Sequence, residues 1–285
     1  MRKTIFCGVA TWCFLLSAIA AAASAAAPGA ARERSYILAV VPYQLPLTVH
    51  KEWSPLAERL AQRLGARVEL KLYRAIPHFE EDLARGEPDL AFMNPYHLIM
   101  TRKTQGYIPL VRSGQALSGI LVVRRDSPIK TVADLNGKTI GFPAPNAFAS
   151  SLYLRALLTE KLKIRFAPVY LDTHNEVYRH VIMGEVDAGG GIPHTLKYEL
   201  AAAREQLRVV YTTPGFPPHP LAVHPRVPAA VRRAVLKAIL DMNADEPGVK
   251  LLEHAQLTDP TAASYQGDYR PLEKLGLEKY VVNSR

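Results

Sequence analysis

Cysteine is nearly absent from this chain of 285 residues, which has two, Cys7 and Cys13, both near its start. The rest of the chain therefore holds no thiol that could form a disulfide, attack a substrate or ligate a metal. No His-Glu-x-x-His pattern occurs, and no Gly-x-Ser-x-Gly elbow surrounds a serine. These absences argue against a thiol enzyme and against a zinc or serine hydrolase, so we expect no catalytic residue, no metal site and no cofactor.

Long apolar runs are also scarce, and the one at the N-terminus is typical of an export signal. Arg2 and Lys3 precede an uncharged stretch, residues 4–31, whose alanine-rich end offers Ala23-Ser24-Ala25 as a cleavage site. Neither cysteine has the small-residue neighbours that a lipoprotein signal requires. We expect residues 1–26 to be a signal peptide cleaved near Ala25, with an uncleaved anchor helix as the alternative.

Charge of either sign is not concentrated anywhere in the chain. The formal net charge is +9, and loss of Arg2 and Lys3 with the signal lowers it by two, to +7. Basic pairs such as Arg124-Arg125 and Arg232-Arg233 are short and scattered, as on solvated helix faces. The composition therefore favours a small anion or an anionic surface as partner over nucleic acid.

One phrase occurs twice, as Gly86-Glu87-Pro88-Asp89 and as Gly184-Glu185-Val186-Asp187. Each copy follows a stretch that can form a helix and leads into an apolar run and a Pro/His loop. In open α/β sheets, loops at the C-terminal ends of strands form the ligand site. The repeat thus indicates two similar α/β lobes with facing loops. The alternative is a common helix-to-strand turn, in which the glycine ends the helix and Asp187 only fixes the turn.

Short β-rich runs alternate with amphipathic stretches along the whole chain. Ser54 as N-cap, Pro55 at the first position and Gly65 as the stop predict one well-marked helix. In the first half we expect strands at 36–41, 68–73 and up to 93, and helices at 54–64 and 76–84. In the second half we expect strands at 120–123, 139–142, 169–171 and 209–211, and helices at 148–158, 175–183 and 229–242.

This alternation predicts an α/β fold with two lobes, each a mostly parallel sheet flanked by helices, and a ligand cleft between them. The Pro-rich segment at 214–220 indicates a crossing back to the first lobe. We therefore expect lobe 1 to comprise residues 33–118 and 215–285, and lobe 2 residues 119–214.

Several motifs in a fixed order resemble one known family. They are an N-terminal Val-Pro loop, Trp53-Ser54-Pro55-Leu56-Ala57, Gly86-x-x-Asp89, Asp134-Leu135-x-Gly137-Lys138 and Gly184-Glu185-Val186-Asp187. Together they are similar to the phosphate/phosphite/phosphonate-binding family of type II periplasmic solute receptors, over nearly the whole mature chain. The resemblance implies a periplasmic receptor whose two lobes, joined by two crossover strands, close on an oxyanion and deliver it to an ABC importer.

The resemblance also implies ligand-binding residues in strand-end loops and at one helix start: Tyr43, Asn94, Tyr96, Ser118, Phe148, Ser150, Ser151 and His174. Where the family has a run of hydroxyls opening a helix, this chain has Ala147 and Phe148 ahead of its serines. This departure leaves room for a different oxyanion, a sulfur-containing one, or an organic acid with an apolar tail. Each residue also has a structural alternative, such as a helix-capping serine or a core histidine.

Two partners fit the resemblance equally well, because relatives with this fold also serve signalling kinases. The first is the permease of an ABC importer, and the second is a membrane sensor kinase. In both cases we expect a small anionic ligand, no nucleic acid and a monomer. A secreted hydrolase is the remote alternative, since no general base stands at a recognisable spacing from Ser150 or Ser151.

Overall fold

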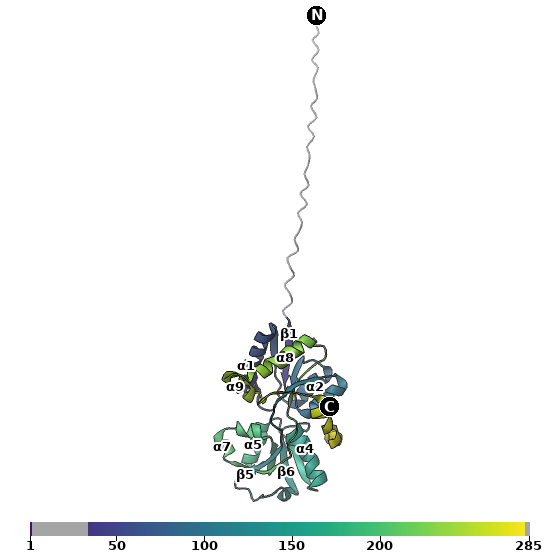
Figure 1. The fold of residues 1–285 in the computed structure, drawn as a ribbon. Helices are drawn as coiled ribbons and strands as arrows, with labels where there is room; N and C mark the ends of the chain where they lie inside the picture. Colours follow the sequence, from purple (N-terminus) through teal and green to yellow (C-terminus); the bar gives the residue numbers. More distant parts are fainter. Residues whose placement is uncertain (2–33, 283–285) are drawn as a thin grey trace. The chain divides into compact units, whose positions relative to one another are not determined.

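The computed structural model describes Met1 and residues 34–282, so the expected signal peptide at 1–26 lies outside the described residues. From Arg34 onward the chain forms one unit, in which the strands make two separate sheets with helices packed around each (Figure 1). Within the described residues, no helix is both long and apolar enough to cross a membrane.

The first sheet has the strand order β11-β4-β10-β3-β1-β2. Its parallel part places β1 between β2 and β3, and β10, β4 and β11 then follow in antiparallel pairs. The bounds are β1 (Ser35–Val40), β2 (Arg67–Lys71), β3 (Leu90–Phe92), β4 (Ile108–Arg112), β10 (Pro220–Val223) and β11 (Thr261–Ala262).

The second sheet has the order β7-β6-β8-β5-β9. Here β6 lies between β7 and β8 in parallel, and β5 and β9 follow in antiparallel pairs. The bounds are β5 (Ile120–Arg124), β6 (Lys138–Phe142), β7 (Phe166–Tyr170), β8 (Ala188–Gly191) and β9 (Leu207–Thr212). Both sheets therefore share one plan, in which three parallel strands are extended by antiparallel ones.

The predicted fold class, an α/β fold with two flanked sheets, is confirmed, but the expectation of mostly parallel sheets is wrong, because both sheets are mixed in strand direction. In each sheet the antiparallel part begins beside the last parallel strand, with β10 next to β3 and β5 next to β8. Both β10 and β5 are the first strands after the chain crosses from the other sheet. A strand that enters directly from the other sheet has no preceding helix to reverse its direction, so it pairs antiparallel.

The doubled Gly-Glu-x-Asp phrase occupies equivalent places in the two sheets. Gly86 and Gly184 both take left-handed backbone conformations that end a helix, with φ of 68° and 76°. The Asp89 carboxylate accepts the N–H of Ile37 in β1 (2.9 Å), and the Asp187 carboxylate accepts the N–H of Thr139 in β6 (2.9 Å). Each aspartate thus ties the start of its own strand to the neighbouring parallel strand, at the edge of the sheet away from the strand-end loops.

The helices flank both sheets, and their bounds differ from the expected ones mainly in α1. This helix begins at Pro46 rather than at Pro55, which lies inside it, and buries Val49 and Trp53 along with Leu56. The helices are α1 (Pro46–Leu64), α2 (Ile76–Arg85), α3 (Pro95–Thr104), α4 (Tyr153–Ala156), α5 (His174–Met183), α6 (Pro193–Lys197), α7 (Ala201–Arg204), α8 (Ala229–Met242) and α9 (Glu246–His254).

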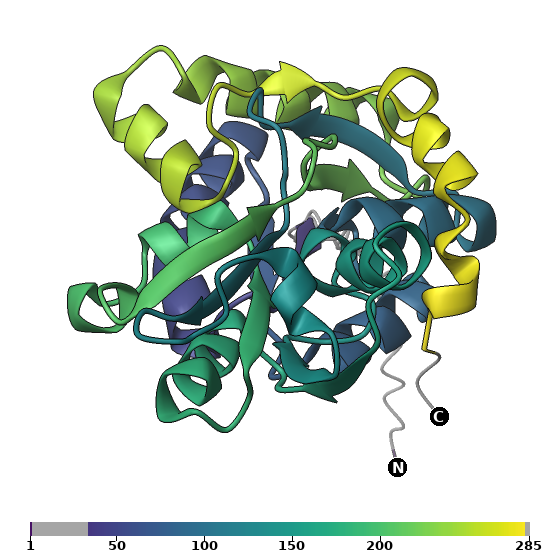
Figure 2. The same cartoon turned by 90° about the horizontal axis from the view of Figure 1, so that it is seen from below.

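Shorter helical segments complete the fold. Two π-helical segments, η2 (Phe148–Leu152) and η3 (Leu157–Lys161), extend α4 at both ends into one continuous helix, which we call the 148–161 helix. The others are η1 (Val132–Leu135), η4 (Tyr265–Tyr269), η5 (Arg270–Leu275) and η6 (Leu277–Tyr280). The last of these lies beside the 148–161 helix, as the yellow and teal segments of Figure 2 show.

Two segments connect the sheets, residues 113–119 between β4 and β5 and residues 213–219 between β9 and β10. They run antiparallel to each other, because the backbones of Leu117 and Phe216 exchange two hydrogen bonds of 2.8 Å. Gly119 and Thr213 are also linked twice: the Gly119 N–H donates to the Thr213 hydroxyl (2.8 Å), and the Thr213 N–H donates to the Gly119 carbonyl (2.9 Å). The crossings therefore form a paired connection rather than two independent linkers.

Candidate functional site

A small cavity lies where the strand-end loops of the two sheets meet. Its walls come from both halves of the chain. The space open to the centre of a water-sized sphere is about 20 Å³, which is enough for about one water molecule. We call it the central cavity, and it is lined by Val41, Tyr43, Ile76, Asn94, Ala147, Phe148, Ala149, Ser150, His174, Ile192 and His219.

Most of these lining residues stand at the beginning of a helix. Asn94 caps α3, Ile192 precedes α6, and Ile76 and His174 are the first residues of α2 and α5. Phe148 opens the 148–161 helix. Parallel strands deliver their following helices at one edge of a sheet, so the positive dipole ends of these helices converge on the central cavity.

The first turn of the 148–161 helix offers unused backbone donors to this cavity. The N–H groups of Ser151 and Leu152 bond to the carbonyl of Ala147 (3.0 and 2.9 Å). Those of Phe148, Ala149 and Ser150 make no hydrogen bond within the described part of the chain. Free N–H groups at a helix start are donors that suit an anion.

His174 is buried and holds this turn to the neighbouring helix. The Thr195 hydroxyl donates to the Ile192 carbonyl (3.1 Å), so its oxygen accepts the proton of His174 Nδ1 (2.7 Å). Nε2 of His174 then accepts from the Ser150 hydroxyl (3.3 Å). Burial lowers the pKa of His174 to about 3, with nearby His194 as a lesser cause. The imidazole is therefore neutral, and Ser150 can redirect its hydroxyl from His174 to a bound anion.

Tyr43 lines the cavity with its ring while its hydroxyl is engaged elsewhere. The hydroxyl donates to Glu52 Oε2 (2.6 Å) and accepts from Trp53 Nε1 (3.1 Å). Burial, and then the charge of Glu52, raises the pKa of Tyr43 well above its ordinary value. The Tyr43 ring therefore forms part of the cavity wall. Its hydroxyl would have to break its hydrogen bond to Glu52 before it could donate to an anion.

Of the eight predicted site residues, five line the central cavity: Tyr43, Asn94, Phe148, Ser150 and His174. The other three lie elsewhere. Tyr96 lines a different cavity, and Ser118 lines a polar cavity next to the central one. The Ser151 hydroxyl donates to the carbonyl of Pro145 (3.2 Å) and accepts from Arg155. It therefore holds the loop ahead of the helix instead of facing the cavity.

His219 lines the cavity although no motif singled it out. It lies in the Pro-rich crossing to β10 and stacks on Phe92 with ring centroids 5.4 Å apart. Burial lowers its pKa to about 3, so this imidazole is also neutral. A histidine among prolines in a predicted crossing segment was the available signal, because such crossings run past the site.

The central cavity holds no formal charge. Among its lining residues, all within the described part of the chain, there is no Lys, Arg, Asp or Glu. Two carboxylates next to lining or neighbouring residues are already engaged, Glu52 with Tyr43 and Glu80 with His97. Helix dipoles, backbone N–H groups and neutral side-chain donors are therefore what the site offers to a ligand, and this combination suits an anion.

Solved structures of the same fold include binding proteins with known ligands. A binding protein component of an ABC phosphonate transporter from Pseudomonas aeruginosa is 14% identical, with a TM-score of 0.76 over 86% of this chain and 86% of that chain. PhnD1 from Prochlorococcus marinus, in complex with methylphosphonate, is 13% identical, with a TM-score of 0.79 over 87% of this chain and 99% of that chain. A Xanthomonas citri protein bound to ATP is 17% identical, with a TM-score of 0.67 over 87% of this chain and 98% of that chain.

At these identities the structural matches show the fold, a type II periplasmic binding protein. The family is shown by the sequence itself. Residues 38–269 match the family model described as "ABC transporter, phosphonate, periplasmic substrate-binding protein". Members of that family capture a substrate for a transporter and are not enzymes, in agreement with the missing catalytic motifs. This chain belongs to the family of periplasmic substrate-binding proteins of phosphonate ABC transporters.

Proposed function

We propose that this protein binds a small phosphonate-type oxyanion in the central cavity and presents it to an ABC permease. The observation that carries the proposal is the meeting of several helix starts at one uncharged cavity. Each helix N-terminus stabilises a nearby anion by about 0.3–1 kcal/mol, and by up to about 2 kcal/mol where it is partly buried. Several of them together replace the cationic side chain that an anion site otherwise uses.

The walls of the cavity favour a ligand with a compact anionic head and a small apolar substituent. Val41, Ile76, Phe148 and Ile192 supply apolar surface next to the polar groups of Asn94, Ser150 and His174. No carboxylate lines the described cavity to receive an ammonium group. The methylphosphonate bound by PhnD1 has this head and substituent, which supports the same class of ligand here.

Calorimetric titration with a panel of anions tests the proposal. We expect methylphosphonate or phosphite to bind at micromolar concentration or tighter. 2-Aminoethylphosphonate should bind at least tenfold more weakly, because no carboxylate lines the central cavity and Glu253, beyond it, is already paired with Lys197. At a ligand concentration of 100 times the Kd, binding adds about 2.7 kcal/mol to the free energy of unfolding, and a thermal shift measures this gain independently.

Sulfate, arsenite and small carboxylates complete the panel, since the hydroxyl-poor start of the 148–161 helix leaves other oxyanions open. If one of them binds more tightly than every phosphonate, the receptor function stands and the ligand class is wrong. If no anion produces heat or a thermal shift, the proposed function is itself refuted.

We further propose that ligand entry requires the two halves to separate. The cavity admits about one water, so a ligand with more heavy atoms cannot enter while the halves are together. The paired crossings at 113–119 and 213–219 are the natural hinge. On this proposal, lobe 1 consists of residues 33–118 and 215–285, and lobe 2 of residues 119–214.

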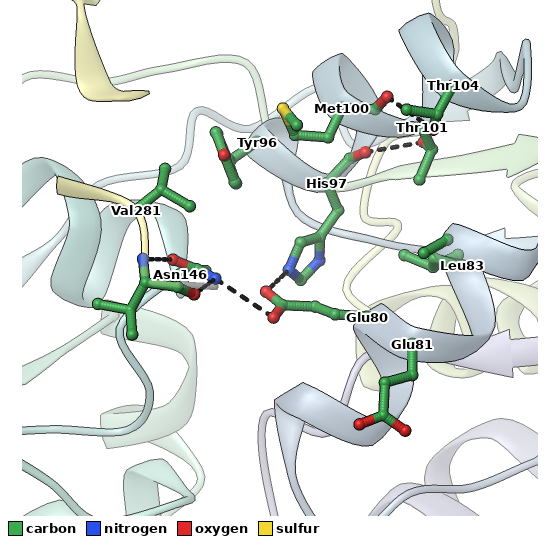
Figure 3. A pocket seen from close by; sticks show the side chains of 12 residues that line it. Glu80, Glu81, Leu83, Tyr96, His97, Met100, Thr101, Thr104, Asn146 and Val281 are labelled. Atoms are coloured by element: carbon green, nitrogen blue, oxygen red, sulfur yellow. Dashed lines mark hydrogen bonds and ion pairs between the residues drawn. The ribbon is translucent and has the colours of Figure 1, made fainter. Parts of the chain in front are cut away.

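Asn146 holds the two proposed lobes together at a separate pocket, which Tyr96 and His97 also line (Figure 3). Its side-chain nitrogen donates to Glu80 Oε2 (3.2 Å), and Glu80 Oε1 bonds His97 Nε2 (2.9 Å). Its backbone carbonyl accepts from Asn94 Nδ2 (3.1 Å). Its side chain also exchanges hydrogen bonds with the backbone of Val282 (2.9 and 3.1 Å). We call these contacts the Asn146 latch, and the latch lies directly ahead of the 148–161 helix.

Replacing Asn146 with alanine is expected to weaken binding of the best ligand about 5- to 30-fold. The change removes the side-chain hydrogen bonds to Glu80 and Val282, each worth about 0.5–1.5 kcal/mol, and so favours the open form. Most of the loss should appear as faster ligand dissociation, which stopped-flow measurements resolve.

Asn136→Ala is the matched control. The Asn136 side chain accepts a hydrogen bond from the backbone of Arg165. Asn136 lies just ahead of β6 and Arg165 just ahead of β7, so both residues belong to the second half. Loss of this hydrogen bond should affect folding stability slightly and leave the dissociation rate unchanged. Equal dissociation rates in Asn146→Ala and the unmodified protein would show that the latch does not stabilise the closed form.

Two features outside the site complete the proposal. We propose that the export signal is removed near Ala25, which N-terminal sequencing of protein recovered from the periplasm checks directly. We also propose that the mature receptor is a monomer, as one ligand between two lobes requires no second subunit. Light scattering coupled to size-exclusion chromatography measures the mass, and a dimer mass would contradict this.

A further inference from the structure

A second, larger cavity adjoins the central one. Ile192 and His219 line both cavities, so the second begins where the first ends. Its space open to the centre of a water-sized sphere is about 350 Å³, against about 20 Å³ for the central cavity. Its walls come from the 113–119 crossing, the start of α6, and residues 253–258, which include the end of α9 and the turn after it. We call it the side cavity.

Two buried polar atoms on its wall have no partner. Gln256 Nε2 and His194 Nε2 are both inaccessible to solvent and make no hydrogen bond in the described part of the chain. A buried donor without a hydrogen-bond partner lowers the free energy of unfolding by about 1–3 kcal/mol. Such atoms are therefore rare unless a ligand or a water molecule accepts their hydrogen bond. Their presence on one cavity wall indicates that the missing partner enters through that cavity.

Gln256 is held in a strained backbone conformation. Its φ is 58°, in the left-handed region that residues other than glycine seldom adopt. The backbone N–H groups of Gln256 and Leu257 bond the carbonyls of Glu253 and Leu252 (3.1 and 2.8 Å), and these bonds fix the turn after α9. Strain of this kind costs about 1–3 kcal/mol and often occurs where a side chain must be aimed at a ligand.

The Gln256 side chain points toward the junction of the two cavities. Its amide lies beside the Tyr43 hydroxyl and lowers the pKa of that phenol slightly. The Tyr43 oxygen already accepts from Trp53 Nε1 (3.1 Å), and Gln256 Nε2 makes no hydrogen bond of acceptable geometry to it or to any other described group. Since Tyr43 lines the central cavity, Gln256 stands within reach of a ligand that extends out of it.

The charges around the side cavity cancel. Lys197 Nζ and the Tyr198 hydroxyl both bond Glu253 Oε1 (2.8 Å each), so the only formal charges on the described wall are paired. Burial lowers the pKa of His194 to about 4, which leaves a neutral ring that packs on Tyr198. An amide nitrogen is only a donor, so the atom that Gln256 lacks is an acceptor oxygen.

We propose that the side cavity is a second subsite, which takes a carboxylate or hydroxyl oxygen on the substituent of an organophosphonate whose phosphonate group occupies the central cavity. Gln256 is its specificity-determining donor, and His194 supplies a second hydrogen bond. The subsite rests on the proposed function, since the phosphonate must first bind in the central cavity.

Phosphonoacetate and propylphosphonate are the probes, because they have similar length and differ in the terminal carboxylate. In calorimetric titrations of the unmodified protein, phosphonoacetate should bind at least about tenfold more tightly than propylphosphonate, because a hydrogen bond to a charged acceptor contributes about that much affinity. This comparison needs no variant. Equal affinity, or a preference for propylphosphonate, overturns the subsite.

Gln256→Glu replaces the donor nitrogen with a second oxygen at nearly the same size. It should lower the affinity for phosphonoacetate relative to methylphosphonate at least tenfold, through loss of the donor and repulsion between carboxylates. His194→Leu should lower the same ratio about threefold or more. Gln62→Glu, the same change on the exposed face of α1, is the control and should leave the ratio unaltered.

The outcomes separate the two proposals. Suppose that methylphosphonate binds, but that Gln256→Glu and His194→Leu leave the ratio of phosphonoacetate affinity to methylphosphonate affinity unchanged. The subsite is then wrong and the receptor function stands. If neither phosphonate binds the unmodified protein, the proposed function fails and the subsite fails with it. Thermal unfolding of each variant, measured without ligand, shows whether a decrease in this affinity ratio is caused by a loss of folding stability.

Discussion

Gly190→Ala is expected to abolish measurable ligand binding and to lower the free energy of unfolding by about 3 kcal/mol. A Cβ on Gly190 of β8 would lie 2.1 Å from the backbone oxygen of Ser150 and 2.7 Å from the ring of Phe142. The oxygen belongs to the first turn of the 148–161 helix and cannot rotate away as a side chain could. The turn must shift, and its N–H groups move with it, so overpacking strain and loss of the anion site occur together.

Gly119→Ala should act on the same turn from the other side, because its Cβ would lie 2.2 Å from the backbone oxygen of Ala149. Gly267→Ala is the control, since the added Cβ meets only the Ser264 side chain at an ordinary 3.5 Å. Calorimetry measures binding, and thermal unfolding should show a melting temperature about 6–12 °C lower for Gly190→Ala. A Gly190→Ala protein that binds its ligand normally would place the anion site away from this turn.

The protein is expected to lose about 4 kcal/mol of folding stability between pH 7.5 and pH 5. Burial lowers the folded-state pKa of His174, His219 and His194 to about 3, 3 and 4, against 6.5 for an unperturbed histidine. Above about pH 6.5 all three are neutral in both states and have no effect. Below that value the three histidines bind protons in the unfolded chain but stay neutral in the folded chain. The free energy of unfolding therefore falls as the pH falls from 6.5 toward 3.

The size of this loss follows from the histidine linkage. One pKa unit corresponds to about 1.36 kcal/mol, so at pH 5 each histidine costs up to about 2 kcal/mol, and partial exposure of His194 and His219 reduces the sum to about 4. Urea unfolding at a series of pH values measures it. His174→Gln should reduce the slope of stability against pH by about one half, because His174 contributes about 2 of the 4 kcal/mol, whereas substitution of the exposed His50 by glutamine should leave the slope unchanged. A stability independent of pH between 7.5 and 5 would contradict neutral, buried histidines.

Local signals in the sequence were sufficient where a residue type determines the backbone by itself. Gly65, Gly86 and Gly184 end their helices in left-handed conformations, as the glycine positions predicted. The strands that the sequence predicted lie near their expected positions, and α8 has the expected bounds, whereas β4, β10 and β11 were not predicted. These features depend on the steric freedom of glycine and on apolar periodicity, which act over a few residues.

Prediction was less accurate where distant packing overrides a local signal. Ser54 and Pro55 are a good helix start, yet α1 begins at Pro46, because Val49 and Trp53 continue the buried face of the helix onto the first sheet. The direction of β10 and β5 could not be read from their residues either. It depends on which strand each one joins after crossing, which is a property of the assembled sheet.

The candidate site shows the same division. Asn94 and His174 could be proposed from the sequence, because they sit at helix starts just after a strand or its loop. His219 and Gln256 carried no such signal, since each reaches the cavities from a segment far away in the chain. Tyr96 and Asn146 lie on the latch side of the fold, which only the contact between the halves defines.

By itself the sequence determined the family, the α/β class with two flanked sheets, and the doubled Gly-Glu-x-Asp turns, because motif order, periodicity and glycine positions are local or additive properties of the chain. Only the tertiary structure decided which groups share a cavity, and which donors there lack partners. Burial, hydrogen-bond satisfaction and the convergence of helix dipoles depend on groups that are distant in sequence and meet only when the sheets are assembled.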